Sequence, residues 1–190
     1  MVDGLEIGFI LDRRWHLMRG QPIVTKREAL VAVCRVLNEA RVPYAIIGGV
    51  ALQVHHPDPR TTVDVDLAVL SREAIPAQAL VVAGFEKTGE FEHSENWRFR
   101  DGTPVQFTDD PPLAAAVDGA GEVELDGVTL RVMGIVDLLR GKIRSGTDPQ
   151  RRRSKQLQDL SDVEALLEVQ PELADALTAE ERGVLDRLRQ

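Results

Sequence analysis

The chain has 190 residues, a formal net charge of −8 and a single cysteine, Cys34. One cysteine excludes a disulfide framework and a zinc site built from cysteines, and the acidic balance argues against broad, non-specific binding of nucleic acid. No run of about 18 apolar residues is present, so the sequence predicts no membrane span. The first residues, MVDGLEIGFILDRRW, lack the basic start and apolar core of a secretory signal, and we expect a cytoplasmic protein.

Residues 1–24 are predicted to form an arm that packs on the following domain. The apolar residues 7–11 within it fit a short strand or a buried turn. The segment 25–28 has the form of a capping box, in which Thr25 caps a helix and Glu28 reaches back to it. Apolar residues at helical spacing extend this predicted helix to about Arg41.

Two apolar runs in the segment 44–70 are predicted to be neighbouring buried strands. The first run ends in Gly48-Gly49, and a short segment compatible with a helix follows before a proline-containing loop. Glycine has no Cβ, and the start of a helix presents free N–H groups, so such a turn is suited to binding a phosphate. The sequence therefore predicts an anion-binding turn between the two strands.

The second apolar run carries two acidic residues, Asp64 and Asp66. Side chains on a strand alternate, so both carboxylates are expected on one face, with Val63, Val65 and Leu67 in the core. Two carboxylates at this spacing repel one another, and a hard divalent cation such as Mg²⁺ or Mn²⁺ would offset the repulsion. We expect Asp64 and Asp66 to be the ligands of this metal.

The order of Gly48-Gly49, a helix and Asp64-x-Asp66 resembles the nucleotidyltransferase superfamily, which includes DNA polymerase β. Arg60-x-Thr62, directly before the aspartates, is similar to the bacterial branch that contains the abortive-infection type IV toxins. The resemblance implies that the two glycines hold a nucleoside triphosphate and that the aspartates bind Mg²⁺ and are catalytic. Arg60 and Thr62 become candidates for nucleotide binding, with a solvated loop as the alternative.

Further strands are expected on either side of a helix that runs from Ser71 to about residue 83. Gly84 is predicted to end this helix, and a strand follows it. Asp101-Gly102 and Asp126-Gly127 have the composition of tight hairpin turns, and the second hairpin is expected at the edge of the sheet. A strand, a helix and another strand in succession require a parallel or mixed sheet.

The strand after Asp101-Gly102 carries Gln106 where the superfamily has a third carboxylate. A glutamine offers a neutral carbonyl oxygen and cannot accept a proton near pH 7. Three interpretations stay open. Asp109 or Asp110 takes over the role, the phosphate of the substrate serves as the base, or the site binds nucleotide without turnover.

From residue 134 onward the chain is predicted to be helical. Lys142 lies on the first of these helices, and a later helix carries Lys155, Asp159 and Asp162 on one face. Its buried stripe is expected to consist of Leu157, Leu160, Val163 and Leu167. This pattern is again similar to the toxin-type branch, and the resemblance implies that Lys142 neutralises triphosphate charge. Lys155 and Asp159 are also spaced for an intrahelical ion pair.

These observations predict an α/β protein with a minimal nucleotidyltransferase fold. An N-terminal arm (1–24) precedes a mixed sheet packed with helices (25–133) and a helical C-terminal extension (134–190). The predicted function is Mg²⁺-dependent transfer of a nucleoside monophosphate from a nucleoside triphosphate to a hydroxyl of a protein, a tRNA end or a small molecule. The alternative is a catalytically degenerate protein that binds a nucleotide or a partner. The resemblance also implies an antitoxin partner.

Overall fold

The computed structural model describes residues 3–20 and 24–188. Residues 1–2 and 21–23 of the expected arm, and residues 189–190 of the expected extension, lie outside the described residues. The chain divides into two compact units, Met1–Gly134 and Ile135–Gln190. Among the helices that the structure describes, none combines the length and the apolar character needed to span a membrane.

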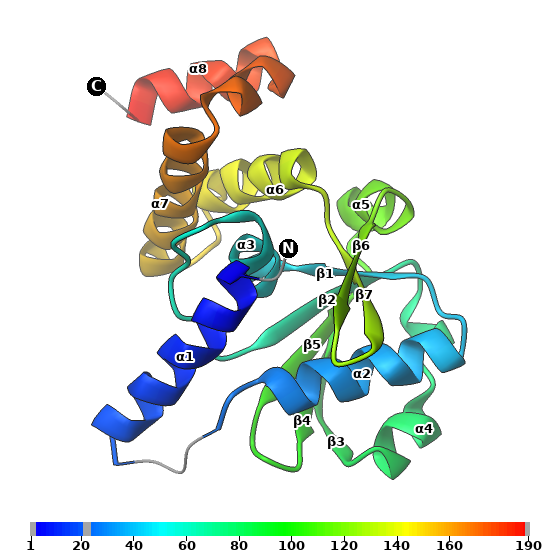
Figure 1. Ribbon diagram of the computed structural model, residues 1–190. Coiled ribbons are helices and arrows are strands. Elements are labelled where there is room, and N and C mark those ends of the chain that lie inside the picture. Colours follow the sequence, from blue (N-terminus) through cyan, green and yellow to red (C-terminus); the bar gives the residue numbers. More distant parts are fainter. Residues whose placement is uncertain (1–2, 21–23, 189–190) are drawn as a thin grey trace. The chain divides into compact units, whose positions relative to one another are not determined.

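The first unit is built on a mixed sheet, which the described residues form from seven strands in the order β3-β4-β5-β2-β1-β7-β6 (Figure 1). The strands are β1 (Tyr44–Ile47), β2 (Val65–Val69), β3 (Phe85–Phe91), β4 (Ser94–Phe99), β5 (Pro104–Thr108), β6 (Gly121–Leu125) and β7 (Val128–Val132). Strand β2 runs parallel to β5, and β1 runs parallel to β7, while the other neighbours are antiparallel. The predicted mixed sheet is confirmed, and so is the place of the β6–β7 hairpin at its edge.

The helices of the first unit are α1 (Asp3–Met18), α2 (Arg27–Glu39), α3 (Gly48–His55), α4 (Ala77–Val82) and α5 (Ala114–Asp118), with short 3₁₀ turns at Arg72–Ala74 and Pro111–Leu113. Helix α2 packs against β7 and α4, and α3 packs against β1 and β2 (Figure 1). Helix α2 buries seven of its residues, most of them aliphatic, so the spacing that predicted it also supplies its core face.

The segment 7–11 is part of helix α1, so the expectation of a short strand or a buried turn was wrong. Two glycines in this helix, Gly4 and Gly8, obscured its pattern because glycine disfavours helix interiors. Both approach Gln53 of α3 so closely that a Cβ at either position would collide with it. The glycines therefore let α1 lie directly on α3, a tertiary contact that local propensity does not report.

Turn and cap predictions had mixed outcomes. The turns at Asp101-Gly102 and Asp126-Gly127 are confirmed, with left-handed φ angles of 96° at Gly102, 52° at Asp126 and 70° at Gly127. The capping box at Thr25 was wrong, because α2 begins at Arg27 and has no side-chain cap. The helix expected from Ser71 is shorter than predicted: Ser71 caps only a 3₁₀ turn, and α4 follows separately.

The second unit consists of α6 (Ile135–Thr147), α7 (Arg153–Val169), a 3₁₀ segment (Pro171–Ala176) and α8 (Ala179–Leu188). Helix α6 packs against both α7 and α8. The expected buried stripe of α7 was partly wrong, because Leu157 is 51% exposed. Gln156, Asp159 and Asp162 are buried instead, so polar groups form much of the inner face of α7.

Candidate active site

The glycine turn between β1 and α3 is shaped by what stands beside it. Gly48 has a φ of +63°, a conformation that favours glycine, and a Cβ there would lie 2.6 Å from Oδ2 of Asp66. A Cβ on Gly49 would lie 2.5 Å from Oγ1 of Thr62. Only a residue without a side chain can bring the first turn of α3 this close to both neighbours. The free N–H groups of the helix start and the Asp66 carboxylate therefore share one small region.

The two predicted metal ligands stand at the start of β2. The strand begins at Val65, so Asp64 directly precedes it and Asp66 is its second residue. Both aspartates are half-buried, and Val65 and Leu67 are fully buried, as the alternation predicts. The expectation for Val63 was wrong, because this side chain is 44% exposed. It lies before the strand, where the alternation of a pleated backbone does not apply.

Gln106 occupies the neighbouring position on β5. In the parallel pairing of β2 with β5, Gln106 is the partner of Asp66, and Asn96 of β4 is the next residue across. Asp64, Asp66, Asn96, Arg98 and Gln106 are among the residues that line a cavity of about 320 Å³. Its acidic lining groups, within the described part of the chain, are the two aspartates alone. Sequence reasoning missed Asn96 and Arg98, whose place follows only from the strand register.

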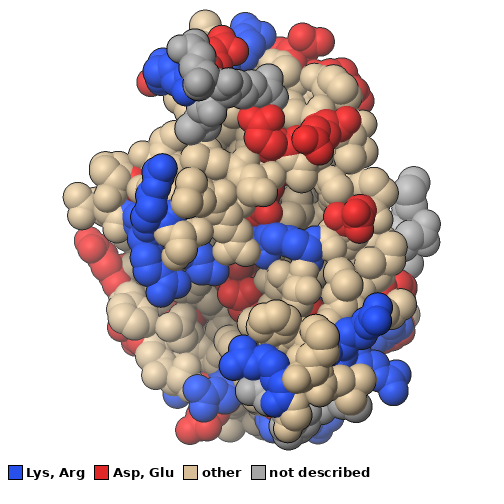
Figure 2. Space-filling model, turned by 90° about the vertical axis from the view of Figure 1, so that its left-hand side faces the viewer, with Lys and Arg blue, Asp and Glu red and all other residues tan. Residues whose placement is uncertain are grey.

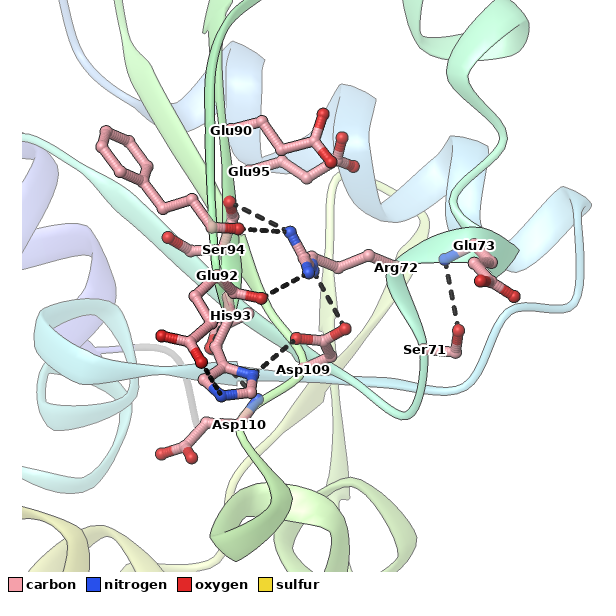
Figure 3. Close-up of polar contacts among 12 residues, drawn as sticks. Ser71, Arg72, Glu73, Glu90, Glu92, His93, Ser94, Glu95, Asp109 and Asp110 are labelled. Atoms are coloured by element: carbon pink, nitrogen blue, oxygen red, sulfur yellow. Dashed lines mark hydrogen bonds and ion pairs between the residues drawn. The ribbon is translucent and has the colours of Figure 1, made fainter.

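Asp109, one candidate to replace the missing carboxylate, is held elsewhere (Figure 3). Its Oδ2 is 2.9 Å from Nε of Arg72, and its Oδ1 is 3.7 Å from Nδ1 of His93. Burial acts to raise the pKa of the Asp109 carboxyl, but the hydrogen bond and charge of Arg72 outweigh it and lower the pKa below its ordinary value. Arg72 also donates to the carbonyls of Phe91, the last residue of β3, and of Glu92, the first residue after it. Asp109 is therefore part of a set of polar contacts, centred on Arg72, that holds the β3–β4 hairpin.

Asp110, the other candidate, precedes the 3₁₀ turn at Pro111–Leu113. Its backbone N–H donates to Oγ1 of Thr108. Neither Asp109 nor Asp110 lines the cavity that Asp64 and Asp66 share. The position beside Asp66 is therefore filled by the amide of Gln106, and these two carboxylates stand outside the cavity.

The donor set fits a magnesium ion that keeps most of its water. Within the described residues, no group of three or more His, Cys, Asp or Glu side chains is placed to hold a metal. Mg²⁺ is commonly bound by one or two carboxylates together with waters and the phosphates of a substrate. Asp64 and Asp66 supply such a pair, and the Gly48 turn leaves room beside Asp66 that a Cβ would fill.

The remaining nucleotide-binding candidates lie at the edges of this region or outside the first unit. Thr62 donates from Oγ1 to Oδ1 of Asp64 at 2.7 Å. Arg60 is half-buried, and its Nη1 donates to the carbonyl of Thr61 at 3.1 Å. Lys142 belongs to the second unit, and the first unit brings together Gly48, Gly49, Thr62, Asp64 and Asp66.

Lys142 is enclosed by carboxylates of α7. Its Nζ lies 2.7 Å from Oδ1 of Asp159 and 2.8 Å from Oδ2 of Asp162, and its side chain is 8% exposed. The other oxygen of Asp159 is 2.9 Å from Nε of Arg151. The expected Lys155–Asp159 pair was wrong: Lys155 is exposed and donates to Gln158, because Asp159 faces inward to Lys142.

Charged side chains of both signs are interspersed over the face shown in Figure 2. Residues 151–153, the only run of three basic residues in the sequence, are exposed. On this face, the described residues form no broad basic stripe of the kind typical of non-specific nucleic-acid binding, which agrees with the net charge of −8.

Solved structures share this fold at low sequence identity. A nucleotidyltransferase-like antigenic protein from Paracoccidioides brasiliensis is 25% identical, with a TM-score of 0.57, over 86% of this chain and 87% of that one. JHP933 from Helicobacter pylori is 16% identical, with a TM-score of 0.56, over 86% and 72%. ANT(2'')-Ia, solved with adenylyl-2''-tobramycin, is 17% identical, with a TM-score of 0.57, over 84% and 98%.

No curated protein sequence matches the chain. A family model does: the one described as nucleotidyl transferase AbiEii toxin, type IV TA system, matches residues 31–189. This match spans most of the sequence, including the glycine turn, both aspartates and the helical unit. The chain therefore belongs to the AbiEii family of nucleotidyltransferase toxins of type IV toxin–antitoxin systems.

Proposed function

We propose that the protein transfers a nucleoside monophosphate from a nucleoside triphosphate to an acceptor hydroxyl, with Mg²⁺ held by Asp64 and Asp66. The observation that carries the proposal is the packing of the Gly48 turn against Asp66. It sets the free N–H groups of a helix start beside a pair of carboxylates. An anion-binding turn next to a metal-binding pair suits a metal–triphosphate substrate.

The residues of the first unit have separate tasks in this reaction. The Gly48-Gly49 turn accepts phosphate oxygens, and the two carboxylates hold the divalent ion, which supplies Lewis-acid charge stabilisation when bound. Arg98 is exposed at the cavity and, among the described residues, has no ion pair, so it is free to contact the substrate. Arg60 and Thr62 directly precede the aspartates, and Lys142 remains a candidate for charge neutralisation.

The transfer forms one bond and breaks one. The acceptor oxygen bonds to the α-phosphorus, the bond from that phosphorus to the bridging oxygen breaks, and pyrophosphate leaves. Gln106 cannot take the proton of the acceptor hydroxyl because its amide has no basic site near pH 7. With Asp64 and Asp66 committed to the metal, a phosphate oxygen of the substrate takes the proton.

The family description supports a toxin that acts in a cell with an antitoxin partner. The acceptor is a hydroxyl of a protein, of a tRNA end or of a small molecule. The exposed arginines at residues 151–153 would favour an RNA acceptor, whereas the net charge of −8 disfavours a long nucleic acid.

Calorimetric titration with each of the four ribonucleoside triphosphates tests the proposal. Binding is expected with Mg²⁺ and should weaken strongly in the presence of a chelator. Asp64→Asn and Asp66→Asn should each lower the Mg²⁺-dependent affinity by about tenfold or more, because each removes a ligand charge. Binding of no triphosphate by the wild-type protein, or full binding by both variants, would refute the assigned site.

A second function is favoured by one observation, the pairing of Gln106 with Asp66 in the position of a third carboxylate. Under this alternative the site binds nucleotide and performs no transfer. Release of pyrophosphate distinguishes the two: nucleotide binding without pyrophosphate release, across protein, RNA and small-molecule acceptors, would support the binding protein.

A further inference from the structure

A lysine and an aspartate of the first unit form a buried ion pair. Lys26, at the N-cap of α2, is 2% exposed, and Asp12 of α1 is 1% exposed. Nζ of Lys26 lies 2.5 Å from Oδ2 of Asp12 and 5.3 Å from the ring centroid of Phe9. Burial lowers the pKa of Lys26 and raises that of Asp12, and the attraction between the two charges opposes both shifts.

The same ammonium group reaches the segment that carries the aspartates. Nζ of Lys26 donates to the carbonyl of Thr62 at 3.0 Å. The hydroxyl of Thr62 donates to Oδ1 of Asp64 at 2.7 Å. Thr62 is 7% exposed, so water competes little for these bonds. A continuous chain of contacts thus leads from Asp12 through Lys26 and Thr62 to a predicted metal ligand.

Asp64 needs such support more than Asp66 does. Asp66 lies within β2, where pairing with Ile47 on one side and Gln106 on the other fixes its backbone. Asp64 precedes the strand and has no partner in either ladder. Hydrogen bonds to ligating carboxylates commonly orient them for a metal. The Thr62 hydroxyl engages one oxygen of Asp64 and leaves the other for a cation.

Stability alone is a poor reason to bury this pair. Removing two charges from water is costly, and apolar residues of similar volume often replace a buried ion pair without loss of stability. What an apolar pair lacks is a donor aimed at the Thr62 carbonyl. The lysine, unlike an apolar residue, can hold the segment before β2 through this hydrogen bond.

We propose that Asp12 and Lys26 are a positioning pair, which fixes Thr62 so that its hydroxyl orients Asp64 for the divalent cation. The proposal rests on the proposed function, since it assigns a role toward the metal held by Asp64 and Asp66. It also gives Thr62 a defined task, to orient a metal ligand rather than to contact the nucleotide.

The test measures affinity for Mn²⁺ by electron paramagnetic resonance of the free ion, on the full chain. The double variant Asp12→Leu/Lys26→Met removes the pair while filling its space. The variant Thr62→Val removes the hydroxyl and keeps the shape of the side chain. The variant Thr62→Ser keeps a hydroxyl at this position. The double variant and Thr62→Val should each weaken Mn²⁺ binding by about 10-fold to 100-fold, which is the usual effect of losing a group that orients a metal ligand. Thr62→Ser should keep the wild-type affinity.

Arg27→Met is the matched control. Arg27 follows Lys26 in the chain, its guanidinium also lies 5.3 Å from the Phe9 ring, and it also pairs with α1, through Glu6 at 2.8 Å. Among the described residues, the hydrogen bonds and ion pairs of the Arg27 guanidinium go to Glu6 and Asp126, and none goes to Thr62. Its variant should bind Mn²⁺ as the wild type does, and thermal unfolding of every variant shows whether the fold is kept.

The outcomes separate this inference from the proposed function. If the wild-type protein binds no Mn²⁺, the metal site itself fails. If the wild type binds and the folded double variant binds equally well, the positioning pair is refuted while the metal site stands. Weak binding by Thr62→Ser, or by Arg27→Met, would also overturn the inference, because the loss would then reflect general loosening of the unit.

Discussion

The two units each bury a lysine, and they surround it differently. In the first unit, Lys26 has one carboxylate partner and spends another hydrogen bond on the carbonyl of Thr62. In the second unit, Lys142 has two carboxylate partners, and one of these is also bound by Arg151. The network of Lys26 continues to the candidate site, whereas Lys142 is paired with carboxylates of its own unit.

This difference shows that a sequence pattern containing a lysine does not establish that the lysine contacts the candidate site. Lys142 is visible in the sequence because a lysine and two helical aspartates form a pattern. Lys26 is invisible there, since its partners are 14 and 36 residues away. Lys142, which the sequence analysis assigned to the triphosphate, is bound by two aspartates. Lys26, which it did not identify, donates a hydrogen bond to the segment that carries Asp64.

The largest expected effect follows from breaking the network of the second unit. Lys142→Met removes the ammonium group that the buried carboxylates of Asp159 and Asp162 share, and should lower the free energy of unfolding by about 3–5 kcal/mol. Chemical denaturation followed by circular dichroism measures it. Exposed Lys155→Met is the control and should change stability little. A stable Lys142→Met variant that loses only triphosphate affinity would instead assign this lysine to the substrate.

Restoring a carboxylate beside Asp66 tests how complete the first site is. Gln106→Glu has nearly the same shape and adds a group that can accept the acceptor proton. If the wild type transfers nucleotide with a phosphate as base, the variant should transfer it about tenfold faster or more, since positioned bases contribute at least this much. The rate of pyrophosphate release measures it, with Gln106→Asn as the control. An unchanged rate would mean that proton removal does not limit the reaction.

Much of the first unit was predictable from local patterns. The strands around Asp66, the glycine turn before α3 and the turns at Asp101-Gly102 and Asp126-Gly127 all follow from alternation and turn chemistry. These strands and turns could be predicted because residues close together in the sequence determine them. The fold class followed from the resemblance and is confirmed by the seven-stranded mixed sheet within the described residues.

Contacts between distant residues were not predictable. Helix α1 was missed because its two glycines serve the approach to Gln53 rather than helix stability. The inner face of α7 was misjudged because Asp159 and Asp162 are buried by an ion pair, which an apolar stripe cannot reveal. The register that sets Asn96 beside Gln106 likewise depends on pairing across strands. These three features depend on contacts between residues far apart in the sequence, which a local sequence pattern does not reveal.

The starts of helices α2 and α8 continue the contrast between the units, because α2 has no side-chain cap and α8 has a capping box. In the second unit, the N–H of Thr178 donates to Oε2 of Glu181 at 2.7 Å, and the N–H of Glu181 donates to Oγ1 of Thr178 at 3.2 Å. Thr178→Ala should therefore destabilise this unit by about 1 kcal/mol. Thr25→Ala, where no cap bond forms, should cost much less. Thermal unfolding of both variants makes the comparison, and equal losses would contradict it.

Titration of His55 should act on the first unit, because this histidine lies on helix α3 of that unit. Burial lowers the pKa of His55 on α3, although Nε2 of its ring is 2.7 Å from the carbonyl of Met133. Since the folded pKa lies below the ordinary value of 6.5, the contribution of His55 to stability is complete above that value. It declines as the pH falls from there through the folded pKa. Wild-type protein should lose more stability than His55→Gln between about pH 7 and pH 5. Thermal unfolding across that range measures the difference, and parallel curves would show that His55 titrates alike in both states.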